Sequence, residues 1–111
     1  MPKPASRACS AYTREAVALL GKLIRQARIE KQITAHELAE RAGVSRGLLQ
    51  RIEKGDLKCE IGAAFELAAI LGITLFDVPT ELTAHHQRVT DRLALLPRYA
   101  RPKTEEVKDD F

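Results

Sequence analysis

The segment that most restricts the fold is residues 34–55, TAHELAERAGVSRGLLQRIEKG, because it carries the start signals of two short helices separated by a glycine turn. Thr34 and Glu37 form a capping box, in which the Thr34 hydroxyl can accept from the Glu37 amide while the Glu37 carboxylate reaches back. The first helix is therefore predicted to begin after Thr34 and to run to about Ala42.

The second helix of this segment follows a turn at Gly43. Glycine readily adopts the left-handed conformation that ends many helices, and Ser45 can cap the helix that comes next. This helix is expected to run from Arg46 to Lys54 and to stop at Gly55. Apolar residues of both helices are expected to face a common core: Leu38, Ala39, Val44, Leu49 and Ile52.

Further helices are predicted on both sides of this segment. On the N-terminal side, a helix capped by Thr13 and ending near Lys31 has apolar residues at three- and four-residue spacing. It is the first helix of the chain. Its apolar residues are Ala16, Leu20, Leu23, Ile24 and Ala27. A helix over residues 60–71, ended by Gly72, is expected to bury Ile61, Phe65, Ala68, Ala69 and Leu71. A short fifth helical turn with Ile73, Leu75 and Phe76 is expected to complete the core before Pro79.

The composition is typical of one all-α domain. A length of 111 residues is that of one ordinary domain, and 45% hydrophobic residues are enough for a single core. Only 5% of the residues are aromatic, which favours packed helices over a β-sandwich. The expected parts are a flexible N-terminal arm (1–13), the compact domain (14–78), an additional C-terminal helix (79–97) and a charged, disordered tail (98–111).

The predicted C-terminal helix carries a stripe of residues whose spacing alternates between four and three. The stripe consists of Leu82, His86, Val89, Leu93 and Leu96. Two heptads are marginal as an isolated coiled coil, so the stripe is expected to pack on the compact domain or on a second subunit. We therefore assign dimerisation to this helix.

The net charge of +3 is distributed unevenly. Residues 1–58 contain 12 Lys and Arg against 6 Asp and Glu, whereas residues 59–111 contain 6 against 9. The basic half is the candidate for binding a polyanion such as DNA.

The helix that begins at Arg46 has an outer side that suits the major groove of DNA. With Leu49 and Ile52 turned inward, the outer residues are Arg46, Gly47, Gln50 and Arg51. Arg can donate two hydrogen bonds to guanine, Gln can pair with adenine, and Gly allows a close backbone approach. These four residues are assigned to base reading. Phosphate binding is assigned to Ser45, Lys54 and Lys58.

The sequence LAERAGVSRGLLQRIEKG resembles the recognition region of the Xre/Cro/phage-repressor family, whose DNA-binding domains contain five helices. The resemblance extends from about Leu20 to Asp77 and implies a lambda-repressor-like helix-turn-helix domain over residues 14–78. In that family an Arg near the end of the first helix pairs with a Glu near the end of the recognition helix. Arg28 and Glu53 match these positions, so a buried or half-buried ion pair is implied, with Arg28 close to the DNA backbone.

One residue departs from the family pattern. The family usually has Gln at the start of the second helix, where it contacts phosphate and braces the recognition helix, but this chain has Ala35. Thr34 or His36 is expected to supply the phosphate contact instead.

A second resemblance covers Cys59 to Phe76 and the end of the chain. The segments CEIGAAFELAAILGITLFD, LALLP and DDF resemble antitoxin-type Xre regulators, which are associated with kinases of the HipA toxin type. This implies a homodimer that represses its own palindromic operator and holds the kinase inactive. The alternative is a protein-interaction module that neutralises such a kinase, with DNA binding secondary.

Other functional classes are not indicated. The sequence lacks a nucleophile-base-acid set and a Gly-rich phosphate loop, so no catalytic residue, enzyme activity or cofactor is expected. Cys9 and Cys59 lack metal-ligand spacing, and His85 and His86 diverge by about 100° on a helix, so no metal site is expected. Without an apolar run of ~20 residues or a signal peptide, the protein is expected to be cytoplasmic and without membrane contact.

Overall fold

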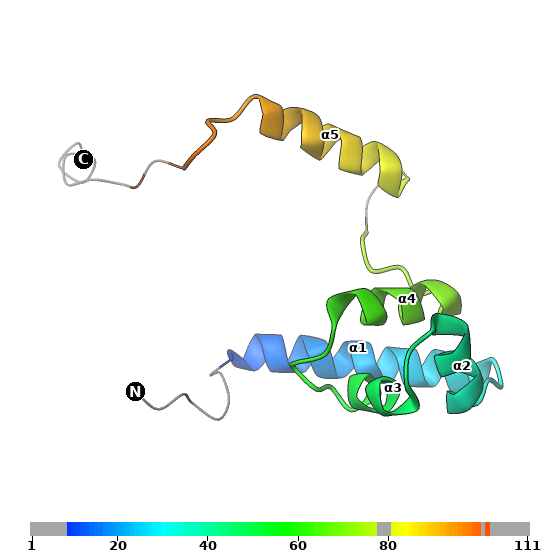
Figure 1. Ribbon diagram of the computed structural model, residues 1–111. Helices are drawn as coiled ribbons and strands as arrows, with labels where there is room; N and C mark the ends of the chain where they lie inside the picture. The colour runs from blue at the N-terminus through cyan, green and yellow to red at the C-terminus, as the bar shows by residue number, and fades with distance from the viewer. Residues whose placement is uncertain (1–8, 78–80, 101, 103–111) are drawn as a thin grey trace. The chain divides into compact units, whose positions relative to one another are not determined.

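The computed structural model describes residues 9–77, 81–100 and 102, over which the chain forms five α-helices and no strand (Figure 1). The helices are α1 Ala11–Glu30, α2 Ala35–Ala42, α3 Arg46–Glu53, α4 Ile61–Leu71 and α5 Leu82–Ala94. The predicted all-α, lambda-repressor-like fold class is confirmed. Most of the predicted N-terminal arm and C-terminal tail lies outside the described residues.

The helices belong to two units, which divide between Leu75 and Phe76. In the first unit α3 packs against α1 and α2, and α4 also packs against α1 and α2. The four largest side chains that are fully buried come one from each helix: Ile24, Leu38, Leu49 and Leu67. The core therefore lies where the four helices meet.

The predicted boundaries of α2 and the predicted start of α3 are confirmed because their signals are local, and α3 ends at Glu53, one residue before the predicted end. Thr34 accepts a hydrogen bond from the Glu37 amide (3.0 Å), and the Glu37 carboxylate accepts one from the Thr34 amide (2.9 Å), which completes the capping box. Gly43 follows α2 with φ of 70°, in the left-handed region. Ser45 then caps α3 by accepting from the Leu48 amide at 3.0 Å.

The start of α1 differs from the prediction. The N-cap is Ser10, whose hydroxyl oxygen accepts a hydrogen bond from the Thr13 amide at 3.1 Å, and the helix begins at Ala11. Thr13 is thus the third helical residue and not the cap. Both residues are good caps, and the earlier one satisfies the amide of the later.

The short helical turn predicted at residues 73–76 is wrong, because residues 73–77 are not helical. Gly72 ends α4 with φ of 77°, and the Ile73 amide donates to the Ala68 carbonyl oxygen at 2.8 Å, which closes the helix. Ile73 and Thr74 are both β-branched and lose side-chain freedom in a helix. Ile73 still packs against the core, as expected.

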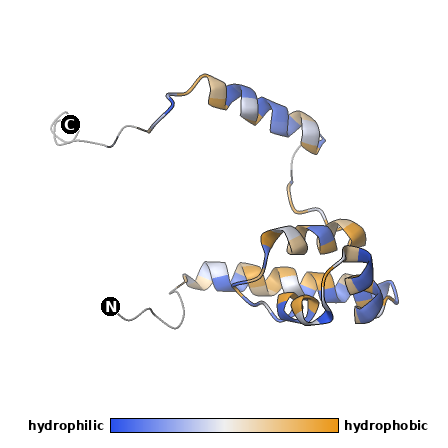
Figure 2. Ribbon diagram, in the orientation of Figure 1, coloured by the Kyte–Doolittle hydropathy of each residue, from blue (hydrophilic) through white to orange (hydrophobic). Residues whose placement is uncertain are grey.

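The prediction of which side of α4 is buried is partly wrong. Ala68 and Leu71 are buried as expected, but Ile61 is 74% exposed, and Phe65 and Ala69 are exposed as well. Ala63 and Leu67 face the core instead. Apolar residues surround most of this helix (Figure 2), so the spacing of apolar residues did not indicate which side is buried.

Gly21 in α1 allows a close approach between α1 and the end of α3. A Cβ atom at Gly21 would lie 2.8 Å from the Glu53 carbonyl oxygen and closer still to that of Ile52. Gly21 is buried, and only a residue without a side chain fits this contact. Gly21 is absent from the contacts predicted from the sequence, although a glycine inside an apolar helix signals such an approach.

The second described unit contains α5. None of the residues of this helix is buried, and its two leucines, Leu82 and Leu93, are more than half exposed. Among the described residues, no helix is both long and apolar enough to cross a membrane.

Candidate nucleic-acid interface

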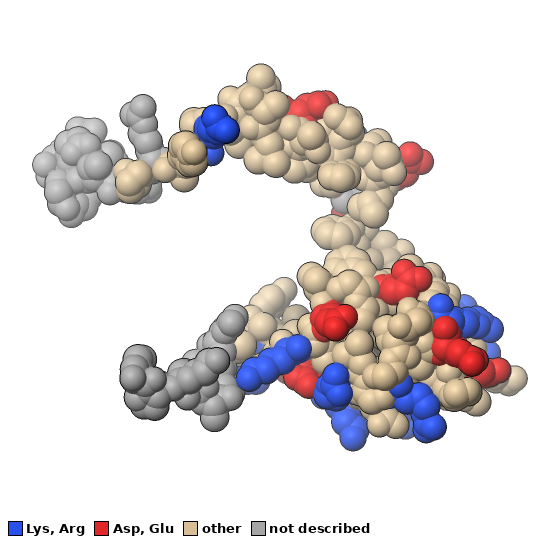
Figure 3. All heavy atoms as spheres, in the orientation of Figure 1, with Lys and Arg blue, Asp and Glu red and all other residues tan. Residues whose placement is uncertain are grey.

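The helix α3 has one buried side and one exposed side. Leu49 and Ile52 are buried in the core. At about 100° per residue the opposite side of the helix carries five exposed residues. These are Arg46, Gly47, Gln50, Arg51 and Lys54. Lys and Arg side chains gather on the side of the domain where α3 lies (Figure 3), so this side offers positive charge as well as hydrogen-bond donors.

The start of α3 presents small residues to the surface. Ser45 uses its oxygen as an acceptor for the helix cap, so its hydroxyl hydrogen is still available for donation. At Gly47 an added Cβ would have Arg51 Nη1 as its nearest neighbour, at 3.8 Å. The space outside Gly47 is therefore open, and a ligand can approach the backbone there.

Arg28 in α1 holds the end of α3 through a paired contact with Glu53. Arg28 Nε donates to Glu53 Oε2 at 2.8 Å, and Nη2 donates to Oε1 at 3.1 Å. The two side chains are only 13% and 7% exposed, respectively. The hydrogen bond to Glu53 raises the pKa of Arg28, against the opposing effect of burial. The pair expected from the resemblance thus joins α1 to α3.

A third nitrogen of Arg28 contacts the loop between α1 and α2. Arg28 Nη1 donates to the carbonyl oxygen of Ile33 at 3.2 Å. Nε, Nη1 and Nη2 each donate one hydrogen bond inside the protein, so Arg28 links α1 to the loop before α2 and to the end of α3.

Arg51 is held toward the loop that follows α3. Its Nε lies 3.7 Å from Oδ2 of Asp56, and the Asp56 amide donates to the Arg51 carbonyl oxygen at 3.0 Å. Burial and Asp56 raise the pKa of the Cys59 thiol, whereas Arg51 lowers it. Arg51 therefore lies next to a carboxylate, unlike Arg46 at the start of the helix, which has no ion pair among the described residues.

The start of α2 carries the two residues expected to replace the missing Gln. Thr34 and His36 are both exposed, and His36 Nε2 lies 4.0 Å from Glu40 Oε2. The Thr34 amide is used by the Glu37 carboxylate. Hydrogen bonds from Thr34 lower the pKa of Glu37, so a stable negative charge lies at the start of α2. Thr34 therefore has only its hydroxyl hydrogen to offer a phosphate.

The two lysines assigned to phosphate lie at the end of α3 and in the next loop. Lys54 and Lys58 are both exposed. The Lys58 amide donates to Asp56 Oδ1 at 2.9 Å, a turn that fixes the backbone at Lys58. The lysines thus continue the exposed basic side of α3 toward α4.

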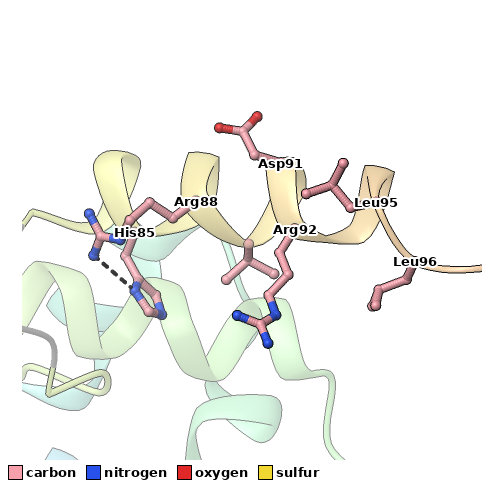
Figure 4. Close-up of a pocket in the computed structure, with 7 residues that line it drawn as sticks. His85, Arg88, Asp91, Arg92, Leu95 and Leu96 are labelled. Carbon is pink, nitrogen blue, oxygen red and sulfur yellow. Dashed lines mark hydrogen bonds between the residues drawn. The ribbon is translucent and has the colours of Figure 1, made fainter.

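Four of the five residues assigned to dimerisation share one side of α5: Leu82, His86, Val89 and Leu93. The helix ends at Ala94, before the predicted end at residue 97, so Leu96 lies beyond it. All five are exposed: Leu82, His86, Val89, Leu93 and Leu96. Val89 lines a shallow pocket on this helix. Figure 4 shows His85 and Arg92 directed to one side of the helix and Asp91 directed to the other. Arg88 Nη2 lies 3.3 Å from His85 Nδ1. The exposed stripe of α5 is therefore flanked by basic residues.

A comparison with known protein families gives a match that lies mainly in the first unit. Residues 24–78 match the model of a helix-turn-helix family, whereas no curated protein matches the chain. The matched segment contains α2, the Gly43 turn, α3 with its exposed basic side, and α4. Residues 24–78 are therefore similar to a helix-turn-helix domain, a class of domain that places the second helix of its motif in the major groove of DNA.

Proposed function

We propose that the protein is a sequence-specific transcription regulator that reads operator DNA with the exposed side of α3. The observation that carries this proposal is the division of α3 into a side anchored in the core and a side free of packing. A helix held in this way can enter the major groove without disturbing the core.

The chemistry of the exposed side matches the base edges of the groove. Arg46 and Arg51 can each donate two hydrogen bonds to guanine, and Gln50 can pair with adenine. Gly47 lets the helix approach closely. Phosphate contacts are proposed for Thr34, His36, Ser45, Lys54 and Lys58.

We place dimerisation on the exposed stripe of α5. A helix of 13 residues with no buried residue is marginal on its own in water, and pairing with a second copy would bury its apolar stripe. Two subunits would then face half-sites of a palindromic operator about 34 Å apart. An operator near the gene itself would make the protein an autorepressor.

A second function is favoured by the same helix. The exposed apolar stripe of α5 lies beside His85, Arg88 and Arg92. Such a surface suits a protein partner with an acidic, apolar groove, and a HipA-like kinase is the partner that we propose. The protein would then act as an antitoxin, and neutralising the kinase would be its main role.

The test of the first proposal is a fluorescence-anisotropy titration at fixed, near-physiological salt. DNA from upstream of the gene is compared with a scrambled duplex, for the wild type and for the Arg46→Ala/Arg51→Ala variant. Specific reading predicts a preference of about a thousandfold for the upstream DNA, lost in the variant. Equal, weak binding to both duplexes would contradict the proposal and favour the protein-partner function.

A further inference from the structure

A surface pocket lies where α1, α2 and α3 meet. Its volume is about 230 Å³, against the ~30 Å³ that one water molecule occupies, so it has room for a phosphate group and its hydration. The lining residues are Arg25, Arg28, Ala35, Gln50, Glu53 and Lys54. The short side chain of Ala35 leaves this space open on the α2 side.

The pocket is positively charged. Arg28 and Glu53 neutralise one another through their paired contact. Arg25 and Lys54 have no ion pair or side-chain hydrogen bond within the described part of the chain, and both are exposed. The pocket therefore has two uncompensated positive charges, one from α1 and one from α3.

The pocket is continuous with the exposed side of α3, because Gln50 and Lys54 belong to both. At the start of α2, the Glu37 carboxylate occupies the Thr34 amide and adds negative charge. An anion that approaches α3 along this side therefore finds its donors on α1 and α3 and not on the Thr34 amide.

We propose that Arg25 and Lys54 hold one phosphate of the DNA backbone at this pocket. Arg25 is absent from the residues that the sequence analysis assigned to DNA. This inference rests on the proposed function, because it needs α3 to lie in the groove. The contact fixes the position of the DNA backbone relative to α3, and it carries no base information.

The first test compares Arg25→Ala with a matched control, Arg14→Ala. Both variants remove one Arg from α1, but Arg14 lies roughly 16 Å farther along the helix, beyond the screening length of about 8 Å at physiological salt. Arg25→Ala is expected to weaken binding to upstream and scrambled duplexes by about the same factor, near tenfold. The slope of log K against log salt should fall by about 1. Arg14→Ala should leave both quantities unchanged.

The second test fills the pocket with a negative charge. Ala35→Glu puts a carboxylate beside Arg25 and Lys54 at the first position of α2, where a negative charge favours the helix. Thermal unfolding should show an intact domain, while affinity for both duplexes falls more than tenfold. Normal DNA affinity of Ala35→Glu, or equal behaviour of Arg25→Ala and Arg14→Ala, would overturn the phosphate site. In that case, specific DNA binding by the wild type would still support the proposed function as a transcription regulator. Absence of DNA binding by the wild type would overturn both.

Discussion

Gly21 of α1 touches the backbone at Glu53 of α3 so closely that a Cβ atom would lie 2.8 Å from the Glu53 carbonyl oxygen. Gly21→Ala should therefore destabilise the domain by about 1 to 3 kcal/mol, because the backbone of α3 would have to move. This loss opposes the gain of about 1 kcal/mol that Ala gives in a helix. Urea unfolding measures the net change.

Gly62 provides the matched control for this prediction. A Cβ atom at Gly62 would have no neighbour within 4 Å, so Gly62→Ala in α4 should be neutral or stabilising by up to about 1 kcal/mol. If Gly21→Ala stabilises the domain as Gly62→Ala does, the close approach of α1 to α3 is not as described.

The Arg28–Glu53 pair should be costly to break from one side. Glu53→Gln leaves the Arg28 guanidinium, 13% exposed, without its carboxylate and should cost roughly 3 kcal/mol of unfolding free energy. Removing both charges with Arg28→Met/Glu53→Gln should cost less than the sum of the two single changes. Strict additivity in a double-mutant cycle would show that the two side chains do not interact in solution.

The capping box at the start of α2 should contribute to the pH dependence of stability. The pKa of Glu37 is lowered by its hydrogen bonds with Thr34, so the folded state holds the ionised form more strongly than the unfolded state does. The contribution is complete above the ordinary carboxyl pKa and is lost as the pH falls through the lowered value. Glu37→Gln should reduce this loss on the acid side, as measured by unfolding from pH 7 downward. An unchanged pH dependence of the unfolding free energy would count against a stabilising role of the capping box.

The α5 stripe should control the oligomeric state. Val89→Asp would place a charge in the middle of the stripe and should convert a dimer to a monomer in sedimentation at micromolar concentration. Thr83→Asp adds the same charge about 60° outside the stripe on the first turn, where it favours the helix, and should leave the dimer intact. A wild type that is already monomeric would contradict the assignment.

Base and phosphate contacts should differ in their effect on specificity. Arg46→Ala should cost about 1 to 3 kcal/mol of binding free energy and relax the preference at one base pair, whereas Lys58→Ala should weaken binding to all sequences alike. Anisotropy titrations with single-base variants of the operator distinguish the two patterns. Uniform weakening of binding to all sequences by Arg46→Ala would show that Arg46 contacts a phosphate and not a base.

The sequence was most informative where structure depends on neighbours in the chain. The caps at Thr34, Gly43 and Ser45 could be predicted because each satisfies its own backbone within three or four residues. The inward side of α3 could be predicted as well, since polar residues cover its other side.

The features that could not be predicted from the sequence involve contacts between segments that are distant in the chain. The orientation of α4 could not be predicted because apolar residues lie on nearly every side, and only the shape of the core selects Leu67 over Ile61. Gly21 shows no periodic signal, and its role depends on a backbone more than 30 residues away. The pocket with Arg25 arises only once three helices meet.

The two sides of α3 also have an evolutionary consequence. The residues that hold the helix in place are different residues from those exposed on its outer side. Arg46, Gly47 and Gln50 should therefore tolerate substitution during evolution with little effect on folding. A lineage could exchange one preferred target for another through a few mutations, and a combinatorial library at these positions should consist mostly of well-folded members.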